Sequence, residues 1–205
     1  MSDSLKFGID VSTLRPTQMT VGLREVELKR REWRDADKEE RSRILRRHVI
    51  PAVVGPKDEP YIVDHHHLAR GLLEEDAGRV AVYVIADLSP LPKGEFWTFL
   101  DNSAWCHAYD RHGRRRELDD IPKRMADLAD DPYRSLVGAL IRQGGCAKSD
   151  KPFFEFLWAD FLRRRIDEDV VEKNFDKALA EALLLAKSDK AKSLPGWSGV
   201  SSQGD

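Results

Sequence analysis

Apolar runs alternate with amphipathic stretches in the first half of the chain, which indicates strands and helices in turn. Short runs rich in Val and Ile predict buried strands at residues 5–11, 49–55, 61–63 and 79–88, the first interrupted at Gly8. Two stretches have helical periodicity: residues 23–47, with a break at 35–40, and residues 65–75. Strand, helix and strand in this order predict an α+β fold in which a small mixed sheet and helices form an α/β layer.

The second half of the chain has a helical pattern without strong strand signals. Helices are expected at residues 118–129, 133–143, 152–166 and 168–187. We therefore expect a sheet domain over residues 1–94, an all-helical C-terminal extension packed on it over 95–190, and a flexible tail over 191–205 whose Trp197 docks on the body. The aromatic residues of 95–109 are expected to cap the sheet rather than to stack on bases.

Composition narrows the classes of function. Hydrophobic residues make up 41% of the 205, enough for a core, and the net charge of −2 gives no global basic field that favours nucleic acid. Contact with DNA is expected to be weak and salt-dependent, because only the cluster at 111–116 is densely basic. No run approaches ~18 apolar residues and residues 2–12 lack a signal-peptide core, so we expect a cytoplasmic protein without a membrane span. Cys106 and Cys146 give no disulfide framework, and neither has a base that would make it a nucleophile.

The central feature is the turn after the strand at 61–63. Asp64 suits the N-cap of the next helix, and the free amides and dipole of a helix start attract anions. His66, His67 and Arg70 lie within the first turn and a half, which predicts a phosphate-binding turn. A capped helix with polar side chains in water is the alternative interpretation.

Known metal and nucleotide motifs limit what this turn could bind. Three consecutive histidines on a helix point about 100° apart and cannot converge on one ion. Asp64 could supply one ligand to a magnesium ion that is held mainly by nucleotide phosphates. The chain contains neither the P-loop nor the Rossmann glycine pattern. The basic cluster RHGRRR at 111–116 could meet phosphates, but a solvated loop balanced by neighbouring acids is the simpler interpretation.

Three segments in order resemble the ParB/sulfiredoxin superfamily, in particular its subgroup labelled "putative ParB-like nuclease". They are FGIDVSTLRPTQ at 7–18, RILRRHVIPAVVG at 43–55 and PYIVDHHHLARGL at 60–72. The resemblance implies a nucleotide-phosphate site at 64–67 faced by the loop at 15–18. The chain departs from the related free-serine kinases, because Leu68 replaces an arginine and Gln18, which cannot take a proton, replaces the base. His66 stands at the position of the sulfiredoxin cysteine, so cysteine-based reduction of sulfinic acid is not expected.

We therefore expect a ParB-like protein that binds a nucleoside di- or triphosphate, or another phosphate compound, with Mg²⁺. Phosphoryl transfer or hydrolysis is the associated chemistry. Asp64, His66 and His67 are the expected catalytic residues, with Asp64 as the metal ligand. The expected nucleotide contacts are Arg15, Thr17, Gln18, His65 and Arg70. The alternatives are a DNA-associated protein or nuclease, which would use 111–116 and the helices at 133–165, and a non-catalytic interaction module.

Overall fold

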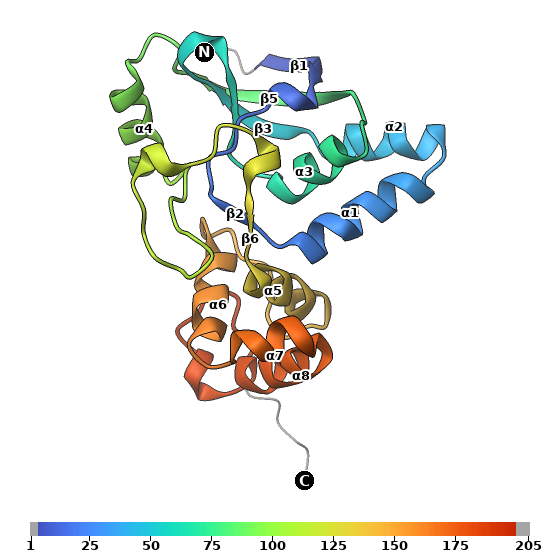
Figure 1. Ribbon diagram of the computed structural model, residues 1–205, viewed down its shortest axis with the longest axis vertical. Coiled ribbons are helices and arrows are strands. Elements are labelled where there is room, and N and C mark those ends of the chain that lie inside the picture. Colours follow the sequence, from blue (N-terminus) through green and yellow to red (C-terminus); the bar gives the residue numbers. More distant parts are fainter. Residues whose placement is uncertain (1–3, 200–205) are drawn as a thin grey trace. The chain divides into compact units, whose positions relative to one another are not determined.

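The computed structural model describes residues 4–199, and the chain divides into two compact units between Asp130 and Asp131 (Figure 1). The expected division at residue 94 differs from this boundary, because side chains of 95–130 are buried with those of the sheet. Packing of the helical part on the sheet part stays a prediction. No helix among the described residues is long and apolar enough to cross a membrane.

The first unit is built on a four-stranded mixed sheet in the order β1-β5-β3-β4. The strands are β1 (Ser4–Asp10), β3 (Ile50–Val54), β4 (Pro60–Ile62) and β5 (Arg79–Asp87). β5 pairs antiparallel with β1 and parallel with β3, and β3 pairs antiparallel with β4. The four predicted strands and the mixed α+β fold are thus confirmed. The interruption at Gly8 is also confirmed: this residue has a φ of 80° where the β1–β5 register shifts.

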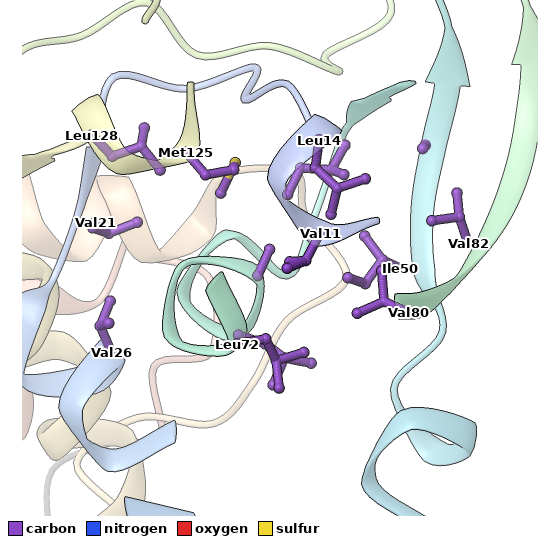
Figure 2. Packing of buried hydrophobic residues seen from close by; sticks show 14 of the residues in the cluster. Val11, Leu14, Val21, Val26, Ile50, Leu72, Val80, Val82, Met125 and Leu128 are labelled. Carbon is purple, nitrogen blue, oxygen red and sulfur yellow. The ribbon is translucent and has the colours of Figure 1, made fainter. Parts of the chain in front are cut away.

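Three helices cover one face of this sheet: α1 (Leu23–Asp35), α2 (Lys38–Arg47) and α3 (His66–Glu74). The predicted break in 23–47 is confirmed, and Asp37 caps α2 by accepting from the Glu40 amide. Figure 2 shows Leu72 of α3 among the apolar side chains of this core, which include Val11, Ile50 and Val80. The short 3₁₀ turn η1 (Val11–Thr13) and the strand β2 (Thr20–Val21) connect β1 to α1.

The opposite face of the sheet is covered by α4 (Lys93–Asn102) (Figure 1). Phe96, Trp97 and Leu100 are buried there, and the Phe96 ring lies 4.7 Å from that of Tyr61. The expectation that aromatic residues of 95–109 cap the sheet is thus confirmed for Phe96 and Trp97, whereas Phe99 is exposed. The helix predicted at 118–129 is wrong. That segment forms the 3₁₀ turns η3 (Leu118–Asp120) and η4 (Met125–Asp127), and then β6 (Ala129–Asp130), which pairs with β2.

The second unit is helical. It contains α5 (Pro132–Arg142), α6 (Phe154–Arg163), α7 (Glu168–Lys173), α8 (Phe175–Ala186) and the 3₁₀ turn η5 (Asp189–Ala191). The single helix predicted at 168–187 is wrong, because the chain breaks at Asn174, whose side chain caps α8. Trp197 packs against the core of this unit, as predicted. The rest of the expected tail, from 200 to 205, lies outside the described residues.

Candidate functional site

The central turn begins one residue later than the sequence predicts. The N-cap of α3 is His65, which has left-handed backbone angles (φ 63°, ψ 26°) and makes no side-chain cap bond. Asp64 Oδ1 instead accepts from the adjacent His65 amide at 2.6 Å. The expectation that Asp64 is the N-cap is therefore wrong, since the left-handed residue separates its carboxylate from the first helical turn.

His66 and His67 hold the loop that precedes α1. His66 is 4% exposed, and its Nε2 accepts from the Thr17 amide at 3.2 Å. His67 Nε2 accepts from the Gly22 amide at 2.9 Å. A ring nitrogen that accepts a hydrogen bond carries no proton, so both rings present an unprotonated Nε2 to the backbone. The two side chains thus bind different amides rather than converging on one point.

The other expected nucleotide contacts are also engaged with the backbone. Thr17 Oγ1 donates to Ile62 O at 2.8 Å, and the buried Gln18 Nε2 donates to Thr20 O at 2.8 Å. Arg70 Nη1 donates to Met125 O and Ala126 O at 2.9 and 2.7 Å. The structure therefore brings Thr17 and His66 together, whereas Arg70 attaches the η4 turn to α3.

His65 lies beside a second histidine. Its ring meets that of His48 edge-on at 6.0 Å. Burial lowers the pKa of His48, and the charges of Lys29 and His65 add to this effect. Among residues 4–199, no three His, Cys, Asp or Glu side chains gather closely enough to hold a metal ion. Magnesium ligation by Asp64, and catalysis by Asp64, His66 and His67, stay predictions.

A cavity of about 610 Å³ is lined in part by Ser12, Thr13 and Arg15, and we call it the Arg15 cleft. Its floor is apolar and comes from β1, β3 and β5, through Ile9, Ala52, Val53, Val54, Val82 and Val84. Its rim carries three cations, Arg15, Lys123 and Arg124, beside the carboxylates of Asp58 and Glu59. Arg124 also pairs with Asp127 at 2.8 Å. The volume falls within the ~300–1,000 Å³ range of small-molecule sites.

Arg15 is held in place on the rim of the cleft. Its guanidinium pairs with Glu59, and its Nη1 donates to Lys123 O at 2.6 Å. Its backbone is fixed to β4, because the Arg15 amide donates to Pro60 O and Arg15 O accepts from the Ile62 amide. The His66–Thr17 bond lies two residues further along the same loop. The predicted turn thus supports the segment that carries Arg15.

Sequence reasoning identified Arg15 but missed Lys123 and Arg124. These two residues follow Pro122 in a loop between η3 and η4, where no periodicity or motif marks them. Their closeness to the Arg15 cleft depends on the return of the chain from α4. Proximity in the sequence could not have indicated it.

Two further sequence expectations concern the cysteines and the basic cluster. Burial raises the pKa of the Cys106 thiol to about 12 and that of Cys146 to about 11, so both remain protonated at neutral pH and are poor nucleophiles. In the cluster at 111–116, Arg115 pairs with Asp101 at 2.7 Å, and Arg116 lies 3.9 and 3.8 Å from Asp110 and Asp120. Acidic side chains therefore balance much of its charge.

Comparison with known proteins agrees with this architecture. The family model described as "Putative ParB-like nuclease" matches residues 7–164. The crystal structure of protein Atu1540 from Agrobacterium tumefaciens superposes with a TM-score of 0.88 at 50% sequence identity, covering 96% of this chain and 99% of that one. The search of curated proteins gives no match. Because the family model spans most of its length, the chain belongs to the ParB-like family described as "Putative ParB-like nuclease".

Proposed function

We propose that the first unit of this ParB-like protein binds a phosphate compound, a nucleoside di- or triphosphate, in the Arg15 cleft. The observation that carries the proposal is the grouping of Arg15, Lys123 and Arg124 around an apolar-floored cavity, in a chain whose net charge is −2. Cations at the rim suit phosphate oxygens, and an apolar floor suits the base and sugar.

The ion pair of Arg15 with Glu59 supports the same proposal. A guanidinium offers a planar pair of donors that matches either a carboxylate or a phosphate. The Glu59 carboxylate therefore lies where a phosphate would contact the Arg15 guanidinium. A bound ligand would replace Glu59 as the partner of Arg15. Because Lys123 O and the β4 backbone hold Arg15 independently, the guanidinium would need little ordering on binding.

Magnesium has a defined place in this proposal. It would arrive with the nucleotide phosphates, which supply most of its ligands, and would add a carboxylate from the protein. In the version that the family resemblance implies, that carboxylate is Asp64, and His65, His66, His67, Thr17, Gln18 and Arg70 meet the nucleotide. In the version centred on the Arg15 cleft, Asp58 and Glu59 are the neighbouring carboxylates.

Calorimetric titration with ATP, ADP and CTP, with and without Mg²⁺, tests both versions. We expect Arg15→Gln and Arg124→Gln each to weaken ATP binding by about tenfold, the effect of one charge-assisted hydrogen bond. Arg43→Gln on α2 is the matched control for Arg124→Gln, because both are exposed arginines in ion pairs, Arg43 with Glu39 and Glu40 and Arg124 with Asp127. It should bind as the wild type does.

The outcomes separate the two placements. If His67→Ala or Asp64→Asn abolishes binding and Arg15→Gln does not, the ligand lies at the central turn. If no nucleotide binds at millimolar concentration, the proposal is wrong. Release of inorganic phosphate from bound ATP, measured in the same samples, tests phosphoryl transfer or hydrolysis separately from binding.

A further inference from the structure

The ion pair of Arg15 and Glu59 lies at the boundary of two cavities in the first unit. One is the Arg15 cleft, and the other is a cavity of about 360 Å³ that we call the Tyr61 cavity. Arg15, Glu59 and Lys123 line both cavities, whereas Tyr61 and Lys57 line only the smaller one. The ion pair is therefore part of the wall of each cavity.

Two groups hold the Glu59 carboxylate, one on each oxygen. Oε1 accepts from the Arg15 guanidinium, and Oε2 accepts from the Tyr61 hydroxyl at 3.3 Å. Burial, together with the charge of Glu59, raises the pKa of Tyr61 to about 12, so this hydroxyl remains a donor at neutral pH. The main chain of Glu59 is fixed separately, because its carbonyl accepts from the Gly55 amide at 2.9 Å. A change of partner at the carboxylate thus requires only rotation of the side chain.

The ion pair is one that a ligand can open. The side chains of Arg15 and Glu59 are 27% and 29% exposed, and ion pairs in contact with water contribute little to the stability of a fold. Arg15 would keep its position without Glu59, because its Nη1 donates to Lys123 O and its backbone is bonded to β4. Opening the pair therefore frees a guanidinium that is already in place.

We infer that Glu59 is an intramolecular competitor for the Arg15 cleft, which holds the Arg15 guanidinium until a phosphate replaces it and then turns into the Tyr61 cavity. The inference rests on the proposed function, because it concerns regulation of the same site. A carboxylate and a phosphate use the same pair of guanidinium donors, so only one of them can be bound there. The displaced carboxylate would keep the Tyr61 hydroxyl as its donor, in a cavity that Lys57 also lines.

Calorimetric titration with inorganic pyrophosphate tests the competition. Mg²⁺ is left out so that no carboxylate can act as a metal ligand, and salt at about 0.15 M screens the exposed charges. Glu59→Gln should bind pyrophosphate about fivefold more tightly than the wild type, the effect expected for loss of a partly exposed ion pair. The gain should disappear when Arg15→Gln is also present, because Glu59 then has no guanidinium to occupy.

Asp58→Asn is the matched control. Asp58 lines the same cleft one residue before Glu59, so the change removes the same charge from the same rim and leaves the Arg15–Glu59 pair intact. Asparagine also tolerates the left-handed backbone of this position, where φ is 59°. We expect this variant to gain less than about twofold in affinity, because a screened charge without a contact to Arg15 acts only at a distance.

Tyr61→Phe tests where the carboxylate goes. The Tyr61 hydroxyl should matter more after Glu59 has lost Arg15, because it is then the remaining donor to a charged group. The variant should therefore bind pyrophosphate about twofold to fivefold more weakly than the wild type, the effect of one partly exposed hydrogen bond. In the Glu59→Gln background the same change should have no effect, which a purely structural role of the ring would not predict.

Three results would overturn the inference. They are pyrophosphate affinity of Glu59→Gln no higher than that of Asp58→Asn, an equal gain when Arg15→Gln is present, and an effect of Tyr61→Phe that is the same with and without Glu59. Absence of pyrophosphate binding to every variant would also refute it. In each case ATP binding that depends on Arg15 would leave the proposed function standing, whereas ATP binding that is absent or independent of Arg15 would refute that function itself.

Discussion

At the scale of single residues, His66 and His67 bind main-chain amides of the loop that precedes α1. His66 is buried, and its imidazole accepts from a main-chain amide that would otherwise lack that bond. A buried amide left without a partner costs about 1–3 kcal/mol. The same side chains that suggest a phosphate site in the sequence therefore have a structural role in the fold.

We predict that His66→Ala lowers the free energy of unfolding by about 1–3 kcal/mol, because it leaves the Thr17 amide unpaired and a space where the ring lay. His67→Ala should cost less, since its bond to the Gly22 amide is only partly buried. Urea unfolding followed by circular dichroism measures both. His112→Ala, at an exposed position in a loop, is the control. Equal stability of the His66 variant and this control would contradict the prediction.

At the scale of elements, the connection between β3 and β4 forms one side of the Arg15 cleft, through Asp58 and Glu59. It passes through Gly55 and then the left-handed residues Lys57 and Asp58. A Cβ atom on Gly55 would lie 2.6 Å from the Tyr61 ring and 2.8 Å from Phe96. The absence of a side chain at this position lets the Tyr61 ring pack against Phe96, with the ring centroids 4.7 Å apart.

We predict that Gly55→Ala destabilises the protein by about 1–3 kcal/mol, because the packed rings of Tyr61 and Phe96 would have to move. The matched control is Gly94→Ala in α4, where an added Cβ meets nothing within 4 Å. That change should be neutral or stabilise the helix by up to about 1 kcal/mol. Thermal unfolding of the two variants measures the difference, and a Gly55 variant as stable as the wild type would show that the packing is looser than described.

At the scale of the whole molecule, the first unit needs the chain as far as residue 130. The segment after residue 94 supplies Phe96, Trp97 and Leu100 to one core cluster, and Met125 and Leu128 to another. Its end, β6, pairs with β2 beside α1. Burying each of these large apolar side chains contributes about 1.5–3 kcal/mol, so together they rival the ~5–15 kcal/mol stability of a typical domain.

We predict that a fragment of residues 1–130 unfolds cooperatively and that a fragment of residues 1–94 does not. The longer fragment retains both core clusters of the first unit, whereas the shorter one loses the side chains that close them. Thermal melts followed by far-ultraviolet circular dichroism distinguish the two. Cooperative unfolding of the shorter fragment would show that the sheet and α1 to α3 are sufficient.

Local pattern was enough to predict the strands, the main helices and the α+β class, because burial imposes a period that the sequence must carry. The order of three segments was enough to identify the family. The helix predictions failed where the sequence has a helical pattern but the backbone does not continue as a helix. Residues 118–129 look helical but form 3₁₀ turns on either side of Pro122, and the side chain of Asn174 caps a new helix within a stretch that looks continuous.

The sequence by itself determined which segments are buried and where a polar turn follows the strand β4. Only the tertiary structure decided which charged side chains meet. Arg15, Asp58 and Lys123 line one cleft but lie in three segments that are far apart along the chain, and no periodic pattern in the sequence marks these segments. Their grouping depends on how the sheet, α4 and the returning loop pack, and packing is a property of the whole core rather than of any short stretch.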